Sequence, residues 1–175
     1  MKRLIIFICE LGNEIHNEEA ADIVGISSVV INDLRQSRQK PYEFDWKTVF
    51  RFKGDTGVRL QFTYCRLHNL IEQHKNHIAE ECDPKALKEE QAIKLVCEIS
   101  RYEENLIQSD LKLEPSILAH YLLRLALVTN EAYDALNIND ADSHTASQRL
   151  LLFNCSKRVL EDGLKLLGLR ALKNM

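Results

Sequence analysis

The sequence predicts an all-α fold, a bundle of several helices, and three observations support this prediction. The chain of 175 residues contains only 6 Gly and 3 Pro, while residues that favour helices, such as Leu, Glu and Lys, are abundant. Apolar residues recur every three or four positions in the longer segments, as on one face of an amphipathic helix. Residues that cap helices stand before several of these segments. The strand–helix alternation of a nucleotide-binding sheet is absent.

The first predicted helix begins after Asn17, a suitable N-cap that is followed by two acidic residues at the positive end of the helix dipole. This helix should end near Arg38, before Pro41. The residues expected to face inward are Ile23, Ile26, Val30 and Leu34. A short helix should follow, capped by Asp45 and containing Trp46 and Phe50.

A tight turn and a long helix come next. Gly54, Asp55, Thr56 and Gly57 predict the turn, because its two glycines permit positive φ. The helix should run from about Val58 to His77 and bury Leu60, Tyr64, Leu67 and Ile71. Phe62 falls on the opposite side, beside Arg66 and Asn69. Two interpretations of Phe62 stay open: it packs against a neighbouring segment, or it offers a stacking surface beside a phosphate ligand.

Further helix starts are marked by Asp83-Pro84 and Glu114-Pro115, since Pro fits the first turn of a helix. The helix from Pro115 should extend through Leu136 and bury Leu118, Leu122, Leu125, Thr129 and Leu136. Tyr133 lies at the margin of that face, where its ring can belong to the core or be offered to a base. The last helix should open at Asp142 or Ser143 and close at Gly168, with Leu169 making the hydrophobic contact of a C-terminal cap.

Charge and cysteine content narrow the class of protein. The net charge is −3, but bases predominate in residues 51–66 and from 145 onward, whereas acids predominate in residues 72–114. This pattern would present two basic regions to a polyanion, and ordinary solvated helix faces explain it equally well. The five cysteines include no Cys-x-x-Cys pair, which indicates reduced, mostly buried thiols of an intracellular protein. No apolar run reaches the ~20 residues of a membrane span.

Recognisable catalytic motifs are absent from the sequence. It contains no glycine-rich phosphate loop, no nucleophile elbow and no metal triad. The spacing of His74, His77 and Cys82 fits no ordinary zinc pattern, so we expect no metal site and no cofactor in this chain. Taken alone, these residues point to binding rather than catalysis.

Several short segments, in order, resemble the C-terminal part of arginyl-tRNA synthetases. The resemblance runs from about Asn17 to Met175. The sequence Asp-Thr-Gly-Val at residues 55–58 and the compact tail are most similar to the mitochondrial and fungal branch of the family. The family commonly reads Leu-Gln-Tyr-Ala-His-Ala-Arg-Leu where this chain has residues 60–67. The other matching segments are residues 21–29, 42–46, the turn at 54–57, 114–116, 132–133, 149–150 and the end of the chain.

The resemblance implies a helical bundle of the DALR anticodon-binding type in residues 54–175. Residues 1–53 would be connecting helices that pack on a catalytic core outside this sequence, which leaves apolar surface around Met1 to Ile31 exposed. The implied partner is the anticodon arm of tRNA-Arg, bound by a monomer without a role at DNA or membranes. Phe62, Tyr133 and Met175 fall on family positions that form a pocket for the anticodon loop, and Gly54 to Gly57 match a loop that lies against tRNA in relatives. With Arg66 and Asn69 beside Phe62, these are the candidate tRNA-binding residues.

Departures from the family limit what the chain is expected to do by itself. Phe62 lacks the usual hydroxyl, and the tail lacks the usual Pro and the basic residue before Met175. The His-x-Gly-His and Lys-Met-Ser-Lys-Ser-like signatures of class I synthetases are absent, so the chain alone is predicted to be inactive as an arginine–tRNA ligase. ATP is implied only for the full-length enzyme. The mitochondrial matrix is the expected compartment and the cytoplasm the alternative. A stand-alone tRNA-binding adaptor and a helical protein-interaction domain are the alternative functions.

Overall fold

The computed structural model describes residues 18–49, 51 and 54–173, and within these ranges helices are the only regular secondary structure. The all-α prediction is therefore confirmed. The α-helices are α2 (Glu18–Leu34), α3 (Trp46–Val49), α4 (Gly57–Gln73), α5 (Glu90–Ser100), α6 (Tyr102–Leu111), α7 (Pro115–Ala135) and α8 (Ser143–Leu166). Two single 3-10 turns, η1 (Lys75–His77) and η2 (Pro84–Ala86), separate α4 from α5.

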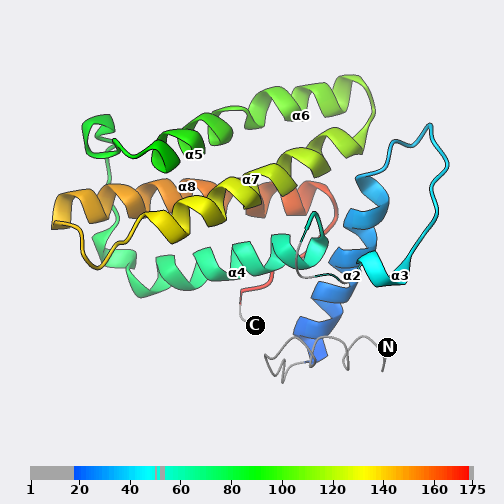
Figure 1. Cartoon of the computed structure of the whole chain (residues 1–175), viewed down its shortest axis with the longest axis horizontal. Helices are drawn as coiled ribbons and strands as arrows, with labels where there is room; N and C mark the ends of the chain where they lie inside the picture. Colours follow the sequence, from blue (N-terminus) through cyan, green and yellow to red (C-terminus); the bar gives the residue numbers. More distant parts are fainter. Residues whose placement is uncertain (1–17, 50, 52–53, 174–175) are drawn as a thin grey trace.

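The long helices form a bundle in which α7 takes the central place. It packs against α4, α5, α6 and α8, while α4 also packs on α8. Figure 1 shows α4, α7 and α8 running alongside one another, with α5 and α6 following end to end along the other side of α7. The helix α2 crosses one end of this bundle and contacts the beginning of α4. Residues 169–173 then return beside α4.

The apolar stripes predicted for α4 and α7 form the main core. Leu60, Tyr64, Leu67 and Ile71 are buried on α4, and Leu118, Leu122, Leu125, Thr129 and Leu136 are buried along and just after α7. The hydroxyl of Thr129 shares a 2.7 Å hydrogen bond with that of Ser156 on α8, so this buried polar pair is satisfied. A smaller apolar cluster joins α2, the start of α4 and the tail, and it comprises Ala20, Ile23, Val24, Val58 and Leu172.

The two predicted ends of α8 are confirmed. Asp142 is its N-cap, and the carboxylate accepts hydrogen bonds from the backbone N–H groups of His144 and Thr145. At the other end Gly168 has a φ of 75°. The N–H of Leu169 bonds the carbonyl of Leu164 at 2.9 Å, and the N–H of Gly168 bonds that of Lys165 at 3.0 Å. This pairing is a Schellman motif, in which buried Leu169 supplies the hydrophobic contact.

The predicted inward face of α2 is partly wrong. Ile26 is 54% exposed, while Ser27 and Ser28 are buried. Each serine hydroxyl donates to the backbone carbonyl four residues earlier, at 2.7 Å, so neither is buried without a partner. Small side chains are needed here because Gly57 of α4 lies against the backbone of Ser27. The helix also ends at Leu34 rather than near Arg38.

Other boundaries differ from the sequence prediction as well. The helix α4 ends at Gln73, before His77, and Asp83-Pro84 opens only the turn η2. A full helix begins at Glu90, and it is interrupted at Arg101. Cys82 and Cys97 are exposed, contrary to the expected burial of the thiols, whereas Cys65 is buried. Asn17 and Phe50 lie outside the described residues, and Asp45 does cap the short helix α3 through the N–H of Lys47.

A search of the described helices finds none that is both long enough and apolar enough to cross a membrane.

Candidate nucleic-acid interface

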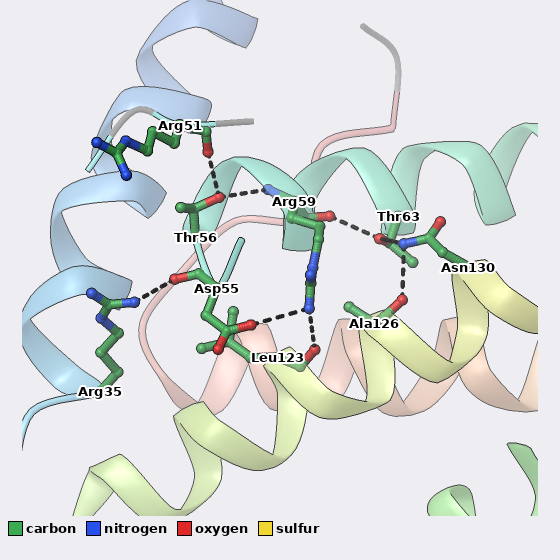
Figure 2. Close-up of polar contacts among 9 residues, drawn as sticks. All are labelled: Arg35, Arg51, Asp55, Thr56, Arg59, Thr63, Leu123, Ala126 and Asn130. Carbon is green, nitrogen blue, oxygen red and sulfur yellow. Dashed lines mark hydrogen bonds and ion pairs between the residues drawn. The ribbon is translucent and has the colours of Figure 1, made fainter. Parts of the chain in front are cut away.

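The turn before α4 is built by contacts with the end of α2 and with α4 itself. The Arg35 guanidinium donates to the Asp55 carbonyl at 2.7 Å, and the Asp55 carboxylate pairs with Arg59 at 3.2 Å (Figure 2). Thr56 caps α4 by accepting from the N–H of Arg59, and its hydroxyl donates to the Arg51 carbonyl at 2.8 Å. The turn is thus held at three points, with its side chains committed to the fold.

The glycines at the two ends of this turn have different structural roles. Gly54 has a φ of 108°, a conformation that other residues adopt only with strain, although a β-carbon there would meet no atom within 4 Å. Gly57 is buried, and a β-carbon there would come within 2.2 Å of the Ser27 carbonyl oxygen. Gly54 and Asp55 are exposed, whereas Thr56 and Gly57 are buried. Only the first half of the turn therefore offers surface to a partner.

A row of polar contacts, the α4–α7 seam, joins Arg59, Thr63 and Arg66 of α4 to α7. Arg59 donates to the Leu123 carbonyl at 3.0 Å, and the Thr63 hydroxyl donates back to the Arg59 carbonyl at 2.8 Å. The Asn130 amide donates to the Thr63 hydroxyl at 2.7 Å and to the Ala126 carbonyl at 2.8 Å (Figure 2). The seam fixes α4 against α7 along the side that carries Arg66.

Arg66 lies directly over the ring of Tyr133 at the far end of this seam. Its guanidinium carbon is 3.7 Å from the ring centroid, a cation–π contact. The same guanidinium donates to Asp134 at 2.7 Å and to the Asn130 side-chain oxygen at 3.4 Å. The ring of Tyr133 also packs near that of Phe153 on α8, with centroids 5.7 Å apart. The structure therefore brings two predicted site residues, Arg66 and Tyr133, into contact.

A pocket of about 290 Å³ adjoins this stack, between the ends of α4 and α7 and the start of the following loop. Its lining combines apolar side chains, the rings of Tyr133 and Phe153, and several polar side chains. The lining residues are Leu70, Gln73, His74, Tyr133, Asp134, Leu136, Asn137, Ile138, Asn139 and Phe153. Amide, imidazole and carboxylate groups together with aromatic and apolar side chains are the functional groups that can bind the edge and face of a planar heterocycle.

Phe62 and Asn69 occupy the strip of α4 between the seam and the tail. Phe62 is half-buried one turn before Arg66, and exposed Asn69 donates to the sulfur of Cys65 at 3.7 Å. The Cys65 thiol in turn donates to the Lys173 carbonyl at 3.5 Å, which brings the tail to this side of α4. Phe62 does not line the pocket beside Tyr133. Met175 lies outside the described residues, so the convergence of Phe62, Tyr133 and Met175 stays a prediction.

Two residues of this surface, Asn130 and Asp134, were not among the candidates from the sequence. They stand four apart on α7, so they share a face of that helix, next to Tyr133. The sequence did contain an indication of this contact, because Asn130 and Asp134 are polar residues that could pair with a basic residue on α4. For a metal ion the described residues offer no group of three or more His, Cys, Asp or Glu side chains.

Comparisons with known proteins show what the chain is similar to. The family model for the DALR anticodon binding domain matches residues 60–175. A probable cytoplasmic arginine–tRNA ligase of Dictyostelium discoideum is 37% identical over 158 residues, which cover 90% of this chain and 27% of the relative. A probable mitochondrial arginine–tRNA ligase of Bos taurus is 35% identical over 152 residues, 87% of this chain and 26% of the relative.

A solved structure of an arginyl-tRNA synthetase has the same fold over this part of its chain. The arginyl-tRNA synthetase of Thermus thermophilus superposes with a TM-score of 0.87 and 26% identity, over 99% of this chain and 30% of that chain. Relatives of both compartments match at similar identity. The chain spans less than a third of the length of each of these three proteins.

Proposed function

The chain belongs to the DALR anticodon binding domain family, as it occurs in arginine–tRNA ligases, and on that premise we propose that it binds the anticodon arm of tRNA-Arg. The observation that carries this proposal is the surface along α4 and α7 where Phe62, Arg66, Asn69 and Tyr133 lie. Single-stranded loops of RNA are recognised by stacking unpaired bases on planar side chains while cations hold the phosphates.

The net charge of −3 is compatible with an RNA partner, because two acids of this surface are paired with bases. Asp134 and Asp55 each pair with one arginine, so the local acids are partly neutralised. The pocket beside Tyr133 supplies polar groups where a loop base would enter. The exposed part of the turn, Gly54 and Asp55, is proposed as a second contact with tRNA.

In a ligase the aminoacylation itself would fall to residues outside this sequence, which would bind ATP and arginine. The proposed role of this chain is to hold tRNA-Arg so that its acceptor end reaches that catalytic domain. We propose that the domain acts as a monomer, without DNA or a membrane as a partner. The mitochondrial matrix is the proposed compartment, on the basis of 35% identity to a mitochondrial relative, and the cytoplasm is the alternative, on the basis of 37% identity to a cytoplasmic relative.

Binding of RNA transcripts by the 175-residue chain tests the proposal. We expect tRNA-Arg, and a hairpin of its anticodon arm, to bind with an affinity that falls steeply as salt rises, since phosphate contacts release counterions. Phe62→Ala and Tyr133→Ala should each weaken binding about ten-fold if one stacked base is lost. Leu111→Ala is the matched control, because Leu111 is a large exposed apolar residue on α6.

Three outcomes would count against parts of the proposal. Unchanged affinity of both aromatic variants would remove the site assignment. Equal binding of every tRNA would favour a general tRNA-binding adaptor. Absent or salt-insensitive binding would favour a helical protein-interaction domain.

A further inference from the structure

We propose that the plane on which a nucleobase stacks is the guanidinium of Arg66, that the ring of Tyr133 supports it from below, and that Asn130 and Asp134 are its positioning residues. This inference rests on the proposed function, and it specifies how that surface holds a base. It assigns the direct contact to a cation, and it gives the aromatic ring an indirect role.

The first argument comes from the ring of Tyr133. The Arg66 guanidinium carbon lies 3.7 Å from its centroid, so this face of the ring is already covered. Phe153 packs nearby, at 5.7 Å between centroids. A base could stack directly on the covered face only after Arg66 had left it. Arg66, by contrast, keeps 31% of its side-chain surface exposed while it covers the ring.

The second argument is that the edge of the guanidinium is held on two sides. Asp134 accepts from one terminal nitrogen at 2.7 Å, and Asn130 accepts from the other at 3.4 Å. Hydrogen bonds in the plane of the guanidinium leave its faces for stacking. Guanidinium planes stack on bases in RNA-binding proteins, and the positive charge strengthens the contact.

The third argument concerns Asn130, whose orientation is fixed by its other partners. Its amide nitrogen donates to both the Thr63 hydroxyl and the Ala126 carbonyl (Figure 2). Both N–H groups are therefore used, and the side-chain oxygen is the atom left to accept from Arg66. Asn130 thus links the position of Arg66 to the packing of α4 on α7.

Substitutions at Arg66 separate its charge from its plane. Arg66→Lys keeps the charge and loses the plane, whereas Arg66→Gln keeps a planar amide and loses the charge. We expect Arg66→Lys to weaken binding of the tRNA-Arg anticodon hairpin by about five-fold or more, with an unchanged salt dependence. Arg66→Gln should weaken binding less than Arg66→Lys does, because a planar amide remains to stack, and it should leave the salt slope unchanged, because a stacked guanidinium makes no phosphate contact. Leu111→Ala, at an exposed position on α6, should bind as the parent chain does.

A double-mutant cycle tests the positioning role of Asn130. Asn130→Ala should weaken binding in the parent chain and have little further effect in the Arg66→Lys background, because the plane it positions is already lost. A purely structural role would give the same loss in both backgrounds. Melting curves of each variant show whether it is folded at the temperature of the measurement.

The possible failures are distinguishable. If Arg66→Lys binds like the parent chain, Arg66 contacts a phosphate only, and the stacking inference is wrong. If Arg66→Lys and Arg66→Ala bind more tightly while Tyr133→Leu binds weakly, Arg66 merely covers Tyr133 and the inference is again wrong. Both outcomes leave the proposed function intact. If the parent chain binds no tRNA, the proposed function and this inference fall together.

Discussion

Glu98 on α5 and Arg124 on α7 form an ion pair whose acidic partner is buried. The Glu98 carboxylate accepts from the Arg124 Nε at 2.5 Å, and only 6% of the Glu98 side chain is exposed. Arg101 contacts the other carboxylate oxygen at 3.4 Å, and the Tyr121 hydroxyl donates to the Glu98 carbonyl at 3.0 Å. These contacts fasten α5 to the central helix α7.

Loss of Arg124 should therefore destabilise the bundle. We expect Arg124→Met to lower the free energy of unfolding by about 1–3 kcal/mol, because the buried carboxylate keeps only the more distant Arg101. Urea denaturation measures this change. The double variant Glu98→Leu with Arg124→Met should be more stable than the single one, since no buried charge is then left unpaired. Equal stability of the single variant and the parent chain would show that the pair contributes nothing.

Gln61 is expected to control whether the tail stays on α4. Its buried amide donates to the Ser27 hydroxyl and to the Arg170 carbonyl, each at 2.7 Å, and its oxygen accepts from the N–H of Leu172 at 2.9 Å. Gln61→Leu should cost about 1–3 kcal/mol, because it leaves buried polar groups unsatisfied. Hydrogen exchange at the Leu172 amide should accelerate more than exchange within α7. Unchanged protection of that amide would contradict this role.

Gly57 should tolerate no side chain. A β-carbon would lie 2.2 Å from the Ser27 carbonyl oxygen, a backbone atom that moves only if α2 separates from α4. We expect Gly57→Ala to cost about 3 kcal/mol or more in thermal unfolding. Gly163→Ala is the matched control, because its β-carbon would meet the side chain of Leu122 rather than backbone, and a side chain can shift more readily. Equal losses for both variants would show that the contact between α2 and α4 yields easily.

The N-cap of α8 should make stability depend on acid pH. Hydrogen bonds from the side chain and backbone of Thr145 lower the pKa of Asp142 below its usual value. A carboxyl whose pKa is lowered in the folded state stabilises it fully above the usual pKa, and this contribution is lost as the pH falls through the lowered value. Asp142→Asn should match the parent chain near pH 7 and lose less stability as the pH falls below about 4.

Melting temperatures across this pH range measure the effect. Asp142→Ala should melt lower than both chains at pH 7, since alanine cannot cap the helix. Identical acid profiles for the parent chain and Asp142→Asn would show that another carboxyl governs acid unfolding.

Local patterns were sufficient to predict the long helices. The apolar side chains on α4 and α7 repeat at the helical period, so each helix has one apolar face, and that face is buried in the core. Asp142 and Gly168 act within one turn of their own helix, so their roles follow from sequence alone. The break at Arg101 was missed because no Pro or Gly marks it.

Contacts between distant segments could not be derived in the same way. Apolar periodicity predicted that Ile26 faces inward. The close approach of Gly57 to α2 instead leaves room only for small side chains, so Ser27 and Ser28 are buried there. The helical periodicity of α4 correctly predicted that Phe62, Arg66 and Asn69 share one side of the helix. It could not predict that Arg66 contacts Tyr133 on α7. That contact depends on the register of α4 against α7, which neither helix encodes alone.

The return of the tail to α4 bears on when this domain can fold during synthesis. Leu172 completes an apolar cluster with Ala20 and Val58, and Arg170 pairs with Glu19, a separation of 151 residues. The helices α5 to α8 can assemble as they leave the ribosome, because their contacts are closer in sequence. The part of the α2–α4 junction that the tail supplies must wait for residues 170–172 to emerge. Nascent chains would therefore leave the side of this junction that Leu172 covers open to chaperones and proteases until the tail has emerged.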